Sequence, residues 1–246
     1  MTSGMSFKNK TITLMGMSGV GKTHLSLMLA KQGWHHHSCD YEIGVNYLRD
    51  EIEQTLGEPN TITSADISQL SRYVGKLGAG HLNFEEFKRR QAQYYNAECQ
   101  SLADLGNVVK GAHAQGHDYV VNDSTGSFCE LGRDDIYDYV GEHSLVVYIK
   151  ANAEEEKAVL QRAQDYPKPM FFPPYALEGW VEDYRMLKGL PSADDFDVDD
   201  FSRWIFPQLF KSRLPKYQAL ADKYGITIES DVLRDVESAD EFLGII

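Results

Sequence analysis

The sequence predicts an α/β fold, in which a doubly wound parallel sheet is covered by helices on both faces. Short apolar, β-prone segments alternate along the chain with longer amphipathic segments, which is the order of βαβ units. The first β-prone segment ends at a glycine-rich turn, and an amphipathic segment follows at once. A chain of 246 residues, 42% of them hydrophobic, can bury an ample core. We therefore expect a single domain over residues 1–246, with helical inserts at about 57–82 and 171–210.

Short runs of apolar and β-branched side chains predict strands over residues 11–15, 119–121, 144–149 and 226–228, and a short second strand is expected over 34–38. Helices are expected where apolar side chains recur at helical spacing, over residues 22–32, 41–56, 65–77, 84–109, 201–223 and 239–246. Another helix should begin after Asn152, which forms a capping pair with Glu155. Four prolines exclude a regular helix or central strand over residues 166–174, so we predict a loop or lid there and an acidic linker over 192–200.

The charge of the chain limits its partners. There are 24 basic and 37 acidic residues, giving a net charge of −13. Such a surface repels phosphate backbones, so we expect neither nucleic acid nor a membrane as a partner. Cys39, Cys99 and Cys129 are odd in number and widely spaced, which favours reduced thiols and a cytoplasmic location. Residues 1–10 contain no long apolar region, so no targeting signal is expected there.

A glycine-rich motif follows the first predicted strand. It matches G-x-x-x-x-G-K-[ST] at Gly16, Met17, Ser18, Gly19, Val20, Gly21, Lys22 and Thr23. Small residues let backbone N–H groups approach phosphate oxygens, and the following helix directs its positive end at the same point. Lys22 can reach the outer phosphates, and the Thr23 hydroxyl can ligate Mg²⁺. The motif therefore predicts that ATP and Mg²⁺ bind at residues 16–23.

Two aspartates stand at the ends of predicted strands. Asp123 ends an apolar strand, where an acid that binds magnesium or its water shell is expected. Asp40 ends the second strand and suits a general base or a substrate ligand. An exposed loop position or a helix cap is the alternative for either aspartate. We expect both in the site.

Together with these residues, several short segments resemble the shikimate kinase-like group of small P-loop kinases. They occur in the family's order between Ile12 and about Ile228: the phosphate loop, Ser38-Cys39-Asp40-Tyr41-Glu42-Ile43, Glu86-Phe87-Lys88, residues 121–127, residues 162–170, and Arg213-Leu214-Pro215-Lys216-Tyr217 followed by Ala221-Asp222. The resemblance implies a five-stranded parallel sheet of strand order 2-3-1-4-5. It also implies that Asp40 and Arg213 hold the acceptor, that Arg162 closes over the phosphates, and that Gly126 faces the transferred group.

The sequence also departs from the family pattern. Ser38 replaces an acid, Lys88 and Lys168 replace arginines, and a glycine triplet is reduced to Thr125-Gly126-Ser127. Lys88 is still expected to bind substrate, although lysine grips a carboxylate less well than arginine does. These changes make shikimate itself an unexpected substrate.

The three consecutive histidines His35, His36 and His37 invite a metal assignment. Neighbouring residues of a strand point to opposite faces, so three in a row do not converge on one ion. We interpret them as histidines of a strand or of the surface.

The sequence thus predicts an ATP-dependent kinase that acts on a small hydroxylated, anionic metabolite. A regulatory ATP-binding protein is the alternative, with residues 171–210 as a surface for a protein partner. A GTPase is not supported, because no N-K-x-D segment occurs in the chain.

Overall fold

The computed structural model describes residues 10–246, so most of the segment predicted to lack a targeting signal lies outside the described residues. The chain forms two compact units. One, the sheet unit, contains the residues up to Cys39, Cys99–Glu156 and Arg213–Ile246. The other, the helical unit, contains Asp40–Glu98 and Lys157–Ser212. Both predicted inserts, 57–82 and 171–210, lie within the helical unit.

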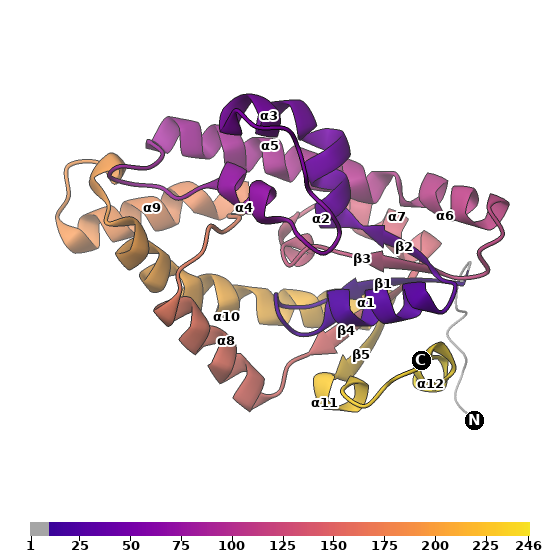
Figure 1. Cartoon of the computed structure of the whole chain (residues 1–246). Helices are drawn as coiled ribbons and strands as arrows, with labels where there is room; N and C mark the ends of the chain where they lie inside the picture. Colours follow the sequence, from indigo (N-terminus) through magenta and orange to yellow (C-terminus); the bar gives the residue numbers. More distant parts are fainter. Residues whose placement is uncertain (1–9) are drawn as a thin grey trace. The chain divides into compact units, whose positions relative to one another are not determined.

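The sheet unit is built on five parallel strands, β1 to β5 in Figure 1. They are β1 (Thr11–Met15), β2 (His35–Ser38), β3 (Val120–Asp123), β4 (Leu145–Lys150) and β5 (Gly225–Glu229). Their order is β2-β3-β1-β4-β5, with each neighbouring pair parallel. The predicted five-stranded parallel sheet and its order are therefore confirmed. Asp123 lies opposite both Leu14 of β1 and Ser38 of β2, so the carboxyl ends of these three strands meet at one edge.

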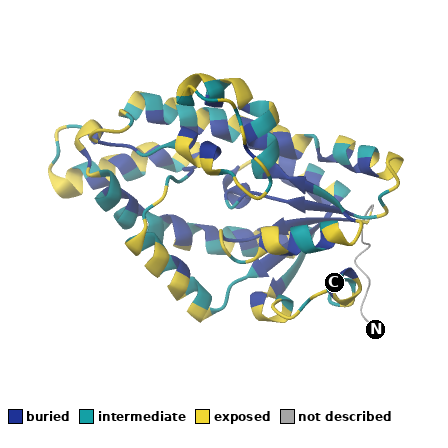
Figure 2. Cartoon of the chain, viewed as in Figure 1, coloured by how far each residue is buried: buried dark blue, intermediate teal, exposed yellow. Residues whose placement is uncertain are grey.

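Helices cover both faces of this sheet. On one face, Leu25 and Leu29 of α1 (Lys22–Lys31) and Phe242 of α12 (Ala239–Leu243) pack into a cluster with Leu14 and Val147. On the other face lie α6 (Leu105–Ala114), α7 (Asp134–His143) and the C-terminal part of α10 (Val198–Tyr224). Figure 2 shows the strands as largely buried and the exposed residues on the outer sides of the helices. The doubly wound arrangement is thus confirmed.

A line of buried polar side chains crosses the second face. Cys39 donates from its thiol to Asn122 Oδ1 (3.2 Å), and Asn122 Nδ2 donates to Thr13 Oγ1 (3.1 Å). Thr13 Oγ1 lies 2.7 Å from Ser144 Oγ, which also donates to the carbonyl of Val140. Because these buried groups satisfy one another, four neighbouring segments are linked without leaving costly unpaired atoms.

The helical unit holds most of the remaining helices. They are most of α2 (Cys39–Glu42), the π-helix η2 (Ile43–Tyr47), α3 (Arg49–Leu56), α4 (Ser68–Val74), most of α5 (Phe84–Ala103), most of α8 (Ala153–Asp165), α9 (Pro174–Lys188), the short η4 (Ala193–Asp195) and the first part of α10. Its apolar side chains form two clusters, one around Tyr73 and Tyr94 and one around Phe172 and Tyr184. The sheet unit also contains the 3-10 helix η3 (Phe128–Glu130) and α11 (Ser230–Leu233).

Several predicted boundaries need correction. The single helix expected over 84–109 is two helices, with α5 ending before Asp104 and α6 beginning after it. The Asp104 carbonyl accepts a hydrogen bond from the N–H of Asn107, only three residues later, which is the spacing of a 3-10 turn. The helix expected over 41–56 is interrupted at Leu48, whose dihedrals are not helical. Pro174 begins α9 instead of ending a loop, since proline fits the first helical position. The acidic linker contains η4, and α10 begins within it.

The cap predicted before α8 is confirmed. The Asn152 N–H donates to Glu155 Oε2 (3.1 Å), and the Glu155 N–H donates to Asn152 Oδ1 (2.9 Å). This reciprocal pair satisfies two N–H groups that a helix N-terminus leaves without partners. It fixes where the chain leaves β4 and enters α8.

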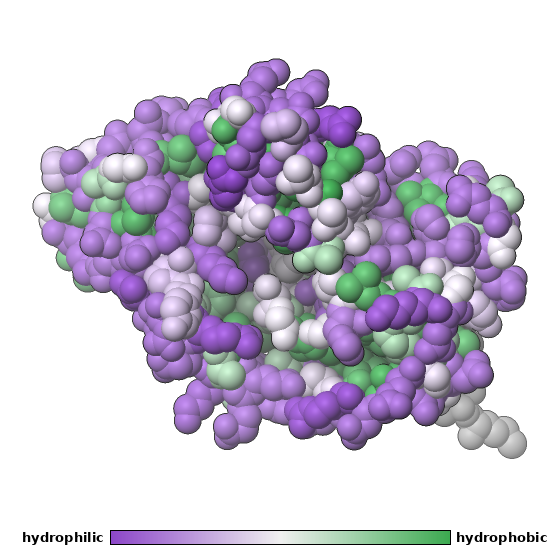
Figure 3. Space-filling model, in the orientation of Figure 1, coloured by the Kyte–Doolittle hydropathy of each residue, from purple (hydrophilic) through white to green (hydrophobic). Residues whose placement is uncertain are grey.

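Within residues 10–246, none of the helices combines the length and the apolar character that crossing a membrane requires. The face drawn in Figure 3 carries mostly hydrophilic residues.

Candidate active site

The glycine-rich motif forms the connection from β1 to α1, as its mechanism requires. Gly16 has a φ of 150°, and an ideal Cβ there would lie 2.6 Å from the carbonyl oxygen of Ile149 in β4. Gly21 precedes α1 with a φ of 105°. Both positions need glycine, the first because β4 approaches closely and the second because of its left-handed backbone. The turn at Ser18 and Gly19 is exposed. Backbone N–H groups at the start of α1 can therefore meet an anion.

Lys22 and Thr23 occupy the first turn of α1. The Lys22 ammonium is buried and donates to the carbonyls of Gly16 (2.7 Å) and Met17 (3.2 Å). These bonds hold the ammonium group against the loop, where it is expected to bind phosphate. Thr23 is exposed at the same helix end.

Asp123 lies at the carboxyl end of β3, opposite Leu14, which precedes the phosphate loop by two residues. Its side chain is buried, with its Oδ2 3.9 Å from His36 Nε2. That ring nitrogen is itself buried and has no hydrogen-bond partner among the described residues. The exposed-loop alternative for Asp123 is therefore wrong. Sequence reasoning missed His36, although the alternation of strand residues places it on the same face of the sheet as Asp123.

A carboxylate and a hydroxyl at this edge are suitable ligands for magnesium. Mg²⁺ prefers hard oxygen donors and keeps much of its water shell. Asp123 and Thr23 supply such oxygens from the end of β3 and the start of α1, two elements that pack together. The donor set therefore fits the predicted ion.

The segment after β3 packs against the phosphate loop. Ser124 donates from its hydroxyl to the Leu14 carbonyl (2.7 Å). An ideal Cβ on Gly126 would lie 3.7 Å from the Ser18 nitrogen and 3.9 Å from Arg213 Nη1. The Gly126 carbonyl accepts a hydrogen bond from the Tyr217 hydroxyl. Within the sheet unit, the phosphate loop, Gly126 and Arg213 are therefore neighbours, as the family resemblance implies.

Arg213 is buried, and a carboxylate holds it. Its Nε donates to Glu130 Oε2 at 2.8 Å, and Lys216 Nζ lies 3.4 Å from Glu130 Oε1. Burial opposes the charged guanidinium, but the neighbouring Glu130 carboxylate prevails and raises the pKa of Arg213. Sequence reasoning missed Glu130. Its only signal is its place four residues after Gly126, and nothing in that spacing points to Arg213.

Burial determines the protonation state of Cys129, next to Glu130. It raises the pKa of the Cys129 thiol to about 12, so this thiol stays protonated at neutral pH.

Asp40, Lys88 and Arg162 belong to the helical unit, so their place beside the phosphate loop stays a prediction. Asp40 accepts a hydrogen bond from the Tyr94 hydroxyl (3.3 Å). Lys88 lies 2.9 Å from Glu85 and 3.5 Å from Glu178. Arg162 is exposed in the last turn of α8.

The sheet order and the loop after β1 give this chain a kinase-like P-loop fold. No protein-family model matches the chain, and no curated protein does. Among solved structures, it is similar to a shikimate kinase from Bacteroides thetaiotaomicron, with 15% identity, a TM-score of 0.44, and coverage of 92% of this chain and 89% of that one. A shikimate kinase from Acinetobacter baumannii in complex with shikimate has 18% identity, a TM-score of 0.43 and coverage of 96% and 89%.

A gluconokinase from Sinorhizobium meliloti 1021 is also similar, with 15% identity, a TM-score of 0.30 and coverage of 88% of this chain and 96% of that one. The chain is thus similar in structure to kinases of the group that its motifs resemble.

Proposed function

We propose that this protein is a kinase that transfers the γ-phosphoryl group of ATP to a hydroxyl group of a small metabolite. The geometry of the phosphate loop supports this proposal most directly. Two glycines with positive φ bracket the loop, and a buried lysine bonds to its carbonyls at the start of a helix. Such a site neutralises a polyphosphate with backbone N–H groups, a helix end and one ammonium. A cytoplasmic location is part of the proposal, because an odd number of buried cysteines suits a reducing compartment.

In the proposed reaction, an acceptor oxygen forms a bond to the γ-phosphorus while the bond from that phosphorus to the bridging oxygen breaks, and ADP leaves. The acceptor's hydroxyl proton passes to Asp40. Lys22 and Arg162 spread the negative charge of the transferring group. Magnesium, held by Thr23 and Asp123, would supply further charge neutralisation. Positioning by this chain's residues matters more than covalent help in such a transfer.

An anionic acceptor was expected because Lys88 and Arg213 were assigned to its binding. Each of these cations lies beside carboxylates of this chain, Lys88 beside Glu85 and Glu178 and Arg213 beside Glu130. Neither therefore favours an anion strongly. The acceptor we propose is therefore a small hydroxylated metabolite.

The test is calorimetry with ATP and Mg²⁺, followed by ADP release in the presence of a library of hydroxylated metabolites. We expect ATP to bind and at least one metabolite to stimulate ADP release. If folded protein takes up no ATP in the presence of magnesium, the proposal fails at its first step.

A regulatory ATPase without a metabolite acceptor is the second candidate. It is favoured by Ser38, which is buried where the resembled family carries an acid. In that case, residues 171–210 would bind a protein partner, and this segment exposes Met186 and Leu187. Slow ADP release that no library member stimulates would support this candidate over the kinase.

A further inference from the structure

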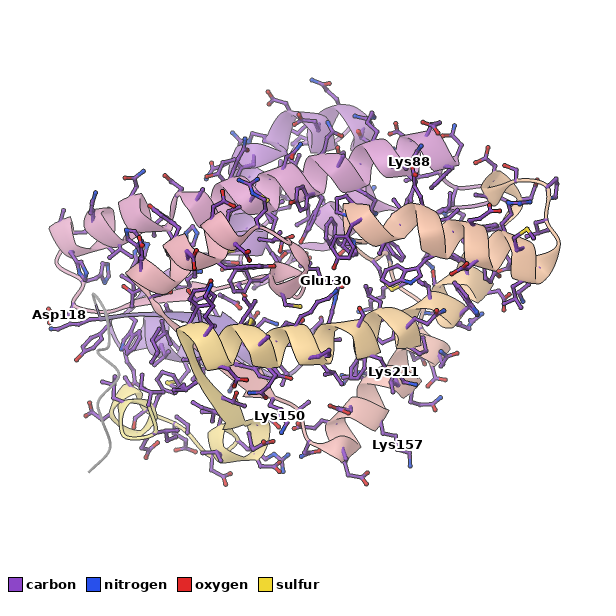
Figure 4. All side chains as sticks on the ribbon, turned by 180° about the vertical axis from the view of Figure 1, so that it is seen from behind. Lys88, Asp118, Glu130, Lys150, Lys157 and Lys211 are labelled. Atoms are coloured by element: carbon purple, nitrogen blue, oxygen red, sulfur yellow. The ribbon has the colours of Figure 1, made fainter. Side chains whose placement is uncertain are left out.

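Glu130 is a carboxylate with no exposed surface, and it carries two cations. Arg213 brings both Nε and Nη2 to 2.8 Å from Glu130 Oε2, while Lys216 approaches Oε1. Figure 4 labels Glu130 beside α10, the helix that carries both cations. A carboxylate buried so completely is stable only with such partners, because an unpaired charge there would be very costly.

The ion cluster belongs to the region where an acceptor would meet the phosphate loop. Gly126 separates the guanidinium of Arg213 from the backbone of Ser18, at the contact distances given above. Residues 213, 216 and 217 lie three and four positions apart on α10, so they share one face of the helix. That face brings Arg213, Lys216 and the Tyr217 hydroxyl to Glu130 and Gly126 together.

Glu130 changes what Arg213 can bind. The edge of the guanidinium formed by Nε and Nη2 is already engaged by a carboxylate. A second carboxylate beside Arg213 would lie close to the first. At an effective dielectric constant of about 20, an anion about 6 Å from Glu130 loses roughly a hundredfold in affinity through this repulsion. A neutral hydroxyl group suffers no such loss.

Lys216 does not cancel this repulsion. Its side chain is 32% exposed, whereas that of Arg213 is 9% exposed. Water and salt therefore screen the lysine much more than the buried pair. Beside Gly126, an acceptor therefore meets Arg213 with its positive charge already neutralised by Glu130.

We propose that Glu130 determines the acceptor class, so that this site gives carboxylates no advantage over their neutral polyhydroxy analogues. This inference rests on the proposed kinase function. Glu130 acts through Arg213, so it is a specificity-determining and positioning residue that need not touch the acceptor.

The experiment uses the full chain, ATP and Mg²⁺, and a library of matched acceptor pairs. Each polyhydroxy carboxylate is accompanied by its methyl ester, so that shikimate is paired with methyl shikimate and gluconate with methyl gluconate. The readout is the ratio of kcat/KM for ester to acid, measured by ADP release. In the wild type, we expect this ratio to be at least about one for the best pair, because the paired arginine offers an acid no net charge. In Glu130→Gln, we expect it to fall by roughly a hundredfold, because the arginine regains its charge.

Two controls separate this effect from net charge and from misfolding. Glu142→Gln makes the same charge change at an exposed position of α7 and should keep the wild-type ratio. Glu130→Gln combined with Arg213→Gln should lose the gain in acid turnover, because the gain requires the arginine. The wild-type ratio needs no variant, so the test stands even if Glu130→Gln does not fold.

A wild type that prefers the acids overturns the proposal, and so does a folded Glu130→Gln variant whose ratio stays within about threefold of the wild type. ATP calorimetry on the same samples separates the two levels of inference. Absence of ATP binding by the wild type counts against the kinase function. Normal ATP binding, with the same ester-to-acid ratio in Glu130→Gln as in the wild type, counts against the role of Glu130 alone.

Discussion

Gly16 opens the phosphate loop where the chain passes close to strand β4. A methyl group added there would meet the Ile149 carbonyl at 2.6 Å, on a backbone with a φ of 150°. The obstacle is a backbone atom of a central strand, so no flexible side chain can move to relieve it. We expect Gly16→Ala to destabilise the protein by about 3 kcal/mol, since positive-φ strain costs about 1–2 kcal/mol and overpacking a further 1–3 kcal/mol.

The assay is thermal unfolding, with ATP calorimetry on the folded variant. For a chain of this size, about 3 kcal/mol corresponds to a fall in Tm of roughly 6–12 °C. Gly33→Ala is the matched control, because Gly33 also has a positive φ, at 93°, but a Cβ there would meet nothing within 4 Å. It should lose only about 1 kcal/mol, the strain alone.

The difference between these two variants isolates the contact with β4. If Gly16→Ala is no less stable than Gly33→Ala, the loop does not approach Ile149 as described. ATP affinity should also fall in Gly16→Ala and stay at the wild-type value in Gly33→Ala.

Three further predictions follow from buried or capping groups. Lys22→Ala should lower metabolite-dependent ADP release at least about a hundredfold with an unchanged circular dichroism spectrum, as the loss of one preorganised charge does; turnover at the wild-type rate contradicts its role. Burial lowers the pKa of His37 to about 4, so the folded state binds fewer protons than the unfolded state and stability falls as the pH drops below about 6.5. Urea unfolding at pH 7 and pH 5 should show a loss of roughly 2 kcal/mol from this group, absent in His37→Gln. Asn152→Ala should cost about 1 kcal/mol by removing the cap that Glu155 shares, and a neutral result in urea unfolding would rule out that contribution.

The sheet could be predicted because its signals are local. A strand ending at Met15, followed at once by glycines and a helix, leaves few alternative conformations, and apolar runs identified the third, fourth and fifth strands. Helix interruptions were harder to predict, because they depend on single backbone groups. The break at Asp104 lies inside a continuous apolar pattern, and only the bond from the Asn107 N–H shows it.

The loop and Asp123 were predictable for the same reason, since each follows directly from the end of a strand. His36 was accessible to sequence reasoning, but the three histidines were interpreted together, as histidines of a strand or of the surface and not as metal ligands. The alternation that argued against a metal also places His36 on the same face as Asp123. A strand pattern therefore predicts which face of the sheet a side chain occupies, but not which residue it contacts there.

Arg213 shows why a motif predicts the position of a residue more reliably than the net charge around it. The segment around Arg213 identified an arginine beside the predicted phosphoryl site, and the structure places it beside Gly126. What an arginine binds depends on the charges already in contact with it, and Glu130 lies 83 residues away in sequence. Pairing with a buried carboxylate changes the local charge by a whole unit, and this equals the charge difference between a substrate carboxylate and a substrate hydroxyl. Acceptor specificity in a divergent chain of this fold should therefore be inferred from the partners of the motif residues, with the motif itself indicating only where to look.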